Sequence, residues 1–170
     1  MIDLGLLVLR LGLGGLLMAH GGQKLFGWFN GPGPEGAGHW LESLGLRPGR
    51  PWAILAGLSE FAGGGMTALG LLHPLGSLAI LGSMIMASVK AHAGRPIWVT
   101  EGGAELPLTN SIIAVSLLLT GPGRLSVDRA LGLRMSPISE GLLVLLGIGA
   151  LVFGFQPATA LTTTNASKSR

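Results

Sequence analysis

The chain is 170 residues long, a length typical of one domain, but only 11% of its residues are charged, whereas soluble domains have about 25%. Apolar residues make up 48% of the chain and another 30 residues are glycine, which excludes a water-soluble globule and a disordered chain and indicates a largely lipid solvent. The formal net charge of +3 comes without a run of Lys or Arg, which argues against nucleic acid as a partner.

Five apolar segments predict membrane helices, since a span needs roughly 20 mainly apolar residues. The first covers residues 4–20 and is interrupted by Arg10 alone. A cleaved signal peptide is the rival interpretation of this segment, but no positive region precedes it. The other segments cover residues 51–72, 75–91, 106–120 and 138–155.

These segments predict an all-α membrane protein, a four-helix transmembrane bundle with a fifth, C-terminal transmembrane helix. We expect a four-helix membrane core over residues 1–136, an additional transmembrane helix over residues 137–156 and a disordered polar tail over residues 157–170. Lys and Arg are in excess on the face with the long loops, which favours a cytoplasmic location for these loops. If the fifth segment does not span the membrane, both faces carry the same number of Lys and Arg residues, so the sequence leaves open which face is cytoplasmic.

Two long loops separate the predicted helices, over residues 21–50 and 92–105. Within the first, residues 38–46 are expected to form a short helix along the membrane interface. Trp28, Trp40 and Trp52 flank this loop, as is typical of rings at the headgroup level. Residues 124–136 predict a short amphipathic helix with Ser126 as its N-cap.

The many glycines are interpreted as packing surface. Helix association in lipid favours small residues four apart, because they let two backbones approach closely. This spacing occurs in the following pairs: Ala53/Gly57, Ser59/Gly63, Gly64/Ala68 and Ala150/Gly154.

Arg10 and Glu60 are charges inside predicted spans, where a charge is rare and normally has a partner. Arg10 lies ten residues before His20, and Glu60 lies nine residues after Pro51, so antiparallel helices would bring both to a similar depth. We therefore expect an Arg10–Glu60 ion pair. It either fixes the register of two helices or borders a site that orients a quinone or an anionic substrate.

Titratable and hydrogen-bonding side chains gather at the helix ends beside the long loops. Such a rim suits a quinone headgroup, which needs partners for two carbonyl groups and a proton route, and histidine is a natural proton donor near neutral pH. The alternative is that these side chains simply meet headgroups and water. The residues are His20, Gln23 and Lys24 after the first helix, Lys90 and His92 after the third, and Glu101 and Glu105 before the fourth.

The absence of cysteine excludes disulfides, thiolate nucleophiles, iron–sulfur clusters and cysteine zinc sites. No protein-borne redox cofactor or metal site is implied, so electron transfer would need a bound small molecule such as a quinone or a cofactor held by a partner. Haem between His20 and His92 is disfavoured, since two histidines are little evidence. His39 and His73 lie in loops and receive no role.

Several motifs resemble the DoxX family of membrane proteins. Leu9-Arg10-Leu11-Gly12 followed by His20-Gly-Gly-Gln23-Lys24-Leu-Phe-Gly27 is similar to the family's opening, and residues 55–64 (LAGLSEFAGG) are similar to its second helix. Residues 102–108 (GGAELPL) and 121–128 (GPGRLSVD) are similar to the segments before and after its fourth helix. The resemblance implies a four-helix core, an association with oxidoreductase activity and a relationship to the small subunit of thiosulfate:quinone oxidoreductase. The segment after Ile138 goes beyond the family's four helices.

Two functions follow as hypotheses. The first is a multi-pass protein of the cytoplasmic membrane that is a component of a quinone-linked oxidoreductase. A redox partner subunit is expected in this case, and homo-oligomerisation is left open. The second is a non-catalytic scaffold that recruits a soluble redox enzyme through residues 21–50; a small transporter is less favoured. For the first, the candidate catalytic residues are His20, Glu60 and His92, and the candidate rim for a quinone or substrate is Arg10, Gln23, Lys24 and Glu105.

Overall fold

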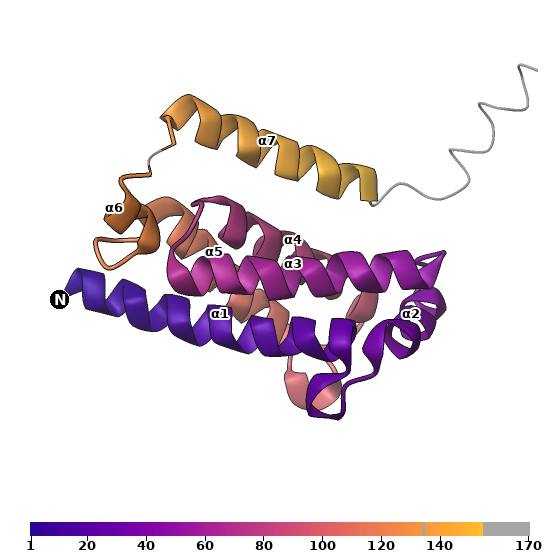
Figure 1. Cartoon of the computed structure of the whole chain (residues 1–170). Coiled ribbons are helices and arrows are strands. Elements are labelled where there is room, and N and C mark those ends of the chain that lie inside the picture. The colour runs from indigo at the N-terminus through magenta and orange to yellow at the C-terminus, as the bar shows by residue number, and fades with distance from the viewer. Residues whose placement is uncertain (134, 155–170) are drawn as a thin grey trace, which may run out of the picture.

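The computed structural model describes residues 1–133 and 135–154, and every regular element within them is helical (Figure 1). This confirms the all-α prediction for the described part of the chain. The α-helices are α1 (Ile2–Phe26), α2 (Gly33–Ser43), α3 (Gly49–Leu69), α4 (Leu75–Ala91), α5 (Glu105–Thr120), α6 (Val127–Leu131) and α7 (Pro137–Gly154), and two 3-10 helices are η1 (Trp28–Asn30) and η2 (Val99–Glu101).

Four helices pack around one apolar core. α1 lies against α3, α3 against α4, α4 against α5, and α5 also contacts α1. α7 contacts α4 and lies along the outside of these helices (Figure 1). The buried side chains of this core come from three of the four helices: Leu13 and Leu17 of α1, Ile80 and Met84 of α4, and Ala114 and Leu117 of α5. A second buried apolar cluster joins α2 to α3 and consists of Ala37, Leu41, Leu46 and Ala53.

The outer surface of the helices is unusually apolar. Contiguous exposed apolar surface indicates contact with a membrane or with another protein. Within the described residues, α1 alone is long and apolar enough to cross a membrane, and α4, α5 and residues 138–149 are shorter apolar helices. Exposed large side chains include Val8, Leu11 and Leu16 of α1, Leu55, Leu58 and Leu69 of α3, Ile112 and Leu119 of α5, and Leu145 and Leu146 of α7.

The first helix is longer than predicted, and this is a correction with consequences for the site. α1 continues six residues beyond His20 and ends at Gly27, which takes the left-handed conformation (φ 69°) that favours glycine at a helix C-terminus. Gln23 and Lys24 therefore lie on the last turns of α1 and not in a loop. α4 has the predicted bounds.

The shorter elements also differ from their predicted bounds. α2 begins five residues before the predicted Gly38 and ends at Ser43. α6 covers five residues where residues 124–136 were predicted, but Ser126 is its N-cap as expected, since the Ser126 hydroxyl accepts from the Arg129 amide at 3.3 Å. The predicted tail, residues 157–170, and the side chains of Ala150 and Gly154 lie outside the described residues.

Glycines set the register between α1 and α3. A Cβ added at Gly14 would lie 2.5 Å from the Gly64 carbonyl oxygen, and one at Gly21 would lie 2.6 Å from that of Gly57. Side chains at these positions would force the two backbones apart. The prediction that Gly57 and Gly64 form a packing surface is confirmed, and Gly63 packs in the same way against Ala79 of α4.

Candidate functional site

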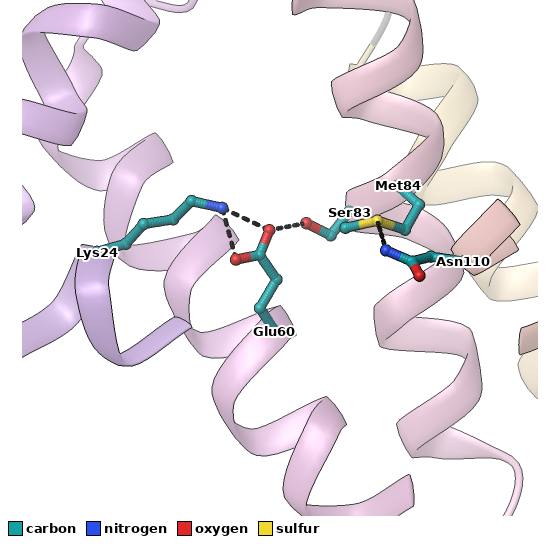
Figure 2. Close-up of polar contacts among 5 residues, drawn as sticks. All are labelled: Lys24, Glu60, Ser83, Met84 and Asn110. Carbon is teal, nitrogen blue, oxygen red and sulfur yellow. Dashed lines mark hydrogen bonds and ion pairs between the residues drawn. The ribbon is translucent and has the colours of Figure 1, made fainter. Parts of the chain in front are cut away.

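The first polar cluster links three helices in the interior of the bundle. Lys24 of α1 donates to both carboxylate oxygens of Glu60 of α3 at 2.5 Å, and the Ser83 hydroxyl of α4 donates to the same carboxylate at 2.9 Å (Figure 2). Glu60 is 3% exposed, whereas the Lys24 side chain is 24% exposed. The buried carboxylate is therefore neutralised by an ammonium group that still reaches the protein surface.

The structure contradicts the predicted Arg10–Glu60 ion pair. Because Gly14 faces Gly64 and Gly21 faces Gly57, Arg10 is level with Ala68 of α3. Glu60 then lies eight residues (60 to 68) from that level, which is about 12 Å along a helix. The prediction measured depth from His20 as the helix end, and the six further residues of α1 shift the register. Lys24, which was expected at the rim, is the partner of Glu60.

Arg10 belongs to a second polar cluster, near the ends of α3 and α5. It is 2% exposed, and its Nη2 donates to the backbone carbonyl of Leu125. A Cβ on Gly70 would overlap Nη1 of Arg10, so the guanidinium lies directly on the left-handed turn (φ 63°) that ends α3. Arg10 thus joins α1 to the segment between α5 and α6.

Asp128 holds the turn between α3 and α4 beside Arg10. Its two carboxylate oxygens accept from the backbone amides of Leu72 at 2.8 Å and His73 at 2.9 Å, and its own amide donates to the Gly70 carbonyl at 3.0 Å. Asp128 is buried. Asp128 ends the motif at residues 121–128, and nothing local to this motif indicates contact with a turn more than fifty residues earlier, so this role could not be predicted from the sequence.

Two hollows adjoin the second cluster. A small inner hollow of about 10 Å³ is lined by Arg10, Thr67 and Ser77, among other residues, and an open outer groove of about 580 Å³ lies between the start of α1, the segment around α6 and the start of α7. His73 and Pro122 line both of them. The inner hollow therefore lies directly behind the groove.

His73 has an environment that sequence reasoning did not anticipate. Burial lowers its pKa below the ordinary value of 6.5, and the nearby negative charges of Glu140 and Asp128 act in the opposite direction. The His73 side chain is therefore neutral at neutral pH. A neutral imidazole can both donate and accept a hydrogen bond at the wall between the two hollows.

The remaining predicted site residues do not join either cluster. His20 is exposed on α1, one turn before Lys24. His92 Nδ1 lies 2.7 Å from the Gly102 carbonyl, and Glu105 accepts from the Val99 amide at 2.9 Å, so both residues hold the loop between α4 and α5. Gln23 packs against Gly31. Among the described residues, no three His, Asp or Glu side chains gather closely enough to hold a metal ion.

Comparison with known proteins agrees with the motifs at the start of the chain. The DoxX family model matches residues 5–93, which is 89 of 170 residues and covers most of α1 and all of α2 to α4, with Arg10, Lys24, Glu60 and Ser83. No curated protein and no solved structure matches the chain. The chain belongs to the DoxX family, whose members are typically membrane proteins.

Proposed function

We propose that this chain is a multi-pass protein of the cytoplasmic membrane and the quinone-binding component of an oxidoreductase related to the small subunit of thiosulfate:quinone oxidoreductase. The observation that carries the proposal is the Lys24–Glu60–Ser83 cluster. Ionisable residues inside apolar helices are rare, and they commonly mark a substrate pathway or a proton relay. Here a carboxylate that is 3% exposed meets an ammonium group at the edge of the bundle.

The dimensions of the helices support several membrane crossings. α3, α4 and α5 have 21, 17 and 16 residues, so they are roughly 24–32 Å long, close to the hydrocarbon thickness of about 30 Å. α3 and α5 pack against α1, which is the one clear span among the described residues, and α4 packs against α3 and α5. Their outward apolar side chains would contact acyl chains, and the long stem of Lys24 would let its ammonium reach the interface.

The chemistry assigned to the cluster is proton delivery. Reduction of a quinone to a quinol consumes two electrons and two protons, which form two O–H bonds at the former carbonyl oxygens. Lys24 would donate a hydrogen bond to one carbonyl oxygen of the quinone, and Glu60 would relay protons to this oxygen. Lys24, two residues from the end of α1, would take up protons from the aqueous side, and His20, one turn farther from that end on the same face, would serve as a second proton donor. The electrons come from a donor oxidised on a partner subunit, since the chain has no cysteine to bind a redox centre.

The test is quinone reduction by the complex isolated from native membranes through this chain. We expect bound quinone in the extract and turnover of a short-chain quinone with thiosulfate as the first donor tried. Glu60→Gln keeps the size and hydrogen-bonding capacity of the side chain but cannot carry a proton, so turnover should fall about 10²-fold. Glu35→Gln, which removes an exposed carboxylate paired with Arg50, is the matched control and should keep full turnover.

The scaffold hypothesis gives a different result in the same preparation. A soluble redox enzyme that copurifies through residues 21–50, with no quinone bound and with turnover unchanged by Glu60→Gln, would contradict the quinone proposal. Circular dichroism and size-exclusion chromatography of Glu60→Gln separate a lost proton route from a lost fold.

A further inference from the structure

The guanidinium of Arg10 has more donors than its surroundings use. It carries five N–H groups, and Nη2 donates one hydrogen bond to the Leu125 carbonyl. The Nε and Nη1 atoms are buried and have no hydrogen-bond partner among the described residues, and the same holds for the hydroxyl of Thr67. Arg10 and Thr67 both line the inner hollow, so the groups that lack partners converge on one small space.

The nearby carboxylate does not satisfy these donors. Each oxygen of Asp128 accepts from a backbone amide, one from Leu72 and one from His73, and no ion pair joins Asp128 to Arg10 in the described part of the chain. A buried charged donor without an acceptor is strongly unfavourable. A ligand that completes this site must therefore supply an acceptor, and a negatively charged acceptor suits the guanidinium best.

The sizes of the two hollows limit the shape of this ligand. The inner hollow of about 10 Å³ admits roughly one oxygen-sized atom. The outer groove of about 580 Å³ can hold the rest of a small molecule, and it presents two cationic side chains, Arg124 and Arg129, together with apolar ones such as Leu6 and Leu133. A ligand could insert one oxygen past His73 and leave its body in the groove.

The acidic residues of the groove do not reverse the preference of the site for a negatively charged ligand. Asp3 also lines it, but one of its carboxylate oxygens accepts from the Arg124 amide at 2.7 Å. Asp128 is held by backbone amides, as described above. Glu140 also lines the groove and lies near His73. Together with Arg10, the two arginines make three guanidinium groups against three carboxylates, so the preference for an oxyanion comes from the buried groups of Arg10 and Thr67 that lack partners and not from the net charge.

We propose that the inner hollow and the outer groove together form a binding site for an oxyanion, with one oxygen placed against Arg10 and Thr67 and the remaining charge beside Arg124 and Arg129. The planar fork of a guanidinium matches the geometry of phosphate and carboxylate groups. The oxyanion is either a free anion or the phosphate of an anionic lipid headgroup, since the groove combines cationic and apolar side chains. This site lies at the opposite end of the helices from Lys24 and does not depend on the quinone proposal.

The experiment measures the thermal unfolding midpoint of the full-length protein in detergent. One arm titrates inorganic phosphate against chloride at constant ionic strength, and the other arm adds micelles with phosphatidylglycerol or with phosphatidylcholine. A ligand that binds the folded state raises the midpoint in a concentration-dependent way. A response to free phosphate identifies a free anion, and a response to phosphatidylglycerol alone identifies a headgroup; either result supports the site.

Variants separate binding from general salt effects, because phosphate also stabilises proteins by exclusion from their surface. Thr67→Val has nearly the same shape but lacks the hydroxyl, and Arg10→Lys lacks the planar guanidinium. Each variant should need an about tenfold higher ligand concentration for the same rise in the unfolding midpoint, which is the loss expected for a charge-assisted hydrogen bond. Arg50→Gln removes an exposed arginine at the other end of the helices and should respond like the wild type. Equal responses in the wild type and Thr67→Val, or no response to either additive, would overturn the proposal, even where Arg10→Lys does not fold.

Discussion

Glu60 and Arg10 are both almost fully buried, yet the molecule stabilises these two charges by different means. Glu60 receives an opposite charge and a hydroxyl donor from neighbouring helices, Lys24 of α1 and Ser83 of α4. Arg10 receives a backbone carbonyl from the segment after α5. The first arrangement holds three helices together in the interior, and the second attaches the α5–α6 segment to the start of the bundle.

The Lys24–Glu60 pair predicts an unequal effect of single and double substitutions. Lys24→Met leaves a buried carboxylate without its counter-ion, and we expect it to lower the free energy of unfolding by about 2–3 kcal/mol. This loss is at or below the lower limit of the losses typical of breaking a buried ion pair, because Lys24 is 24% exposed and water screens the pair in part. Lys24→Met combined with Glu60→Met should be less harmful than Lys24→Met alone. Unfolding by a denaturing detergent, followed by circular dichroism, measures these differences.

The control for this comparison of single and double substitutions is the pair Arg50–Glu35, both of whose side chains are 66% exposed. Its single substitutions should change stability by about 0–1 kcal/mol. If the double Lys24/Glu60 variant is as unstable as the summed single losses predict, the two charges do not stabilise each other.

The residues of the first cluster could be predicted from the sequence in part. Composition and hydropathy identify Arg10 and Glu60 as charges inside apolar helices, and Lys24 as a polar residue near a helix end. Their pairing could not be predicted, because it depends on where α1 ends. The left-handed turn at Gly27, and not the polar residues from His20 onward, ends this helix.

At the scale of elements, the close approach of α1 and α3 depends on glycines that face each other. Gly14 lies against Gly64, and Gly21 lies against Gly57, two helical turns along. Both helices repeat glycine at this seven-residue spacing, so the contact can form in one register. The sequence indicated the small-residue surface on α3, but it did not show which residues of α1 face it.

This contact predicts opposite effects for neighbouring glycines on α1. Gly14→Ala would place its Cβ 2.5 Å from the Gly64 carbonyl oxygen and separate the two helices, so we expect a loss of about 1–3 kcal/mol in the free energy of unfolding. Gly15→Ala has open space around its Cβ and should be neutral or slightly stabilising, since alanine favours helix over glycine by about 1 kcal/mol. Thermal unfolding of both variants in detergent makes the comparison.

Equal destabilisation by the two alanines would contradict this register. A second comparison in the same helices is Gly21→Ala against Gly12→Ala. Gly21 contacts the α3 backbone, and Gly12 has nothing within contact distance.

The α-helical architecture and the membership in the DoxX family can be predicted from composition and motifs. The second polar cluster, which contains Arg10 and Asp128 near α6, cannot. The turn after α3, the segment after α5 and Arg10 are distant in sequence and come together through hydrogen bonds of Asp128 and Leu125. No short-range pattern reports such contacts. Residues 121–128 form a motif that is visible in the sequence, whereas their attachment to His73 and Arg10 appears in the folded chain alone.

The path of the chain predicts which loops share a side of the membrane. α2 and η2 lie at the end where α3 and α5 begin, whereas α6 lies at the end with the N-terminus (Figure 1). The chain has no cysteine, so a single introduced cysteine reports its own position without background. Ser43→Cys in α2, Thr100→Cys in η2 and Ala130→Cys in α6 are exposed positions for this purpose.

In sealed vesicles of one orientation, we expect an impermeant maleimide to label Ser43→Cys and Thr100→Cys from the same side and Ala130→Cys from the other. The physical reason is that, in the proposed multi-pass arrangement, α3, α4 and α5 would each cross the bilayer once. Two crossings would then separate Ser43 from Thr100, and one crossing would separate Thr100 from Ala130. Detergent should make all three cysteines equally reactive, which is the control for local accessibility. Labelling of all three from one side of intact vesicles would place these helices on the membrane surface, and the multi-pass arrangement would be wrong.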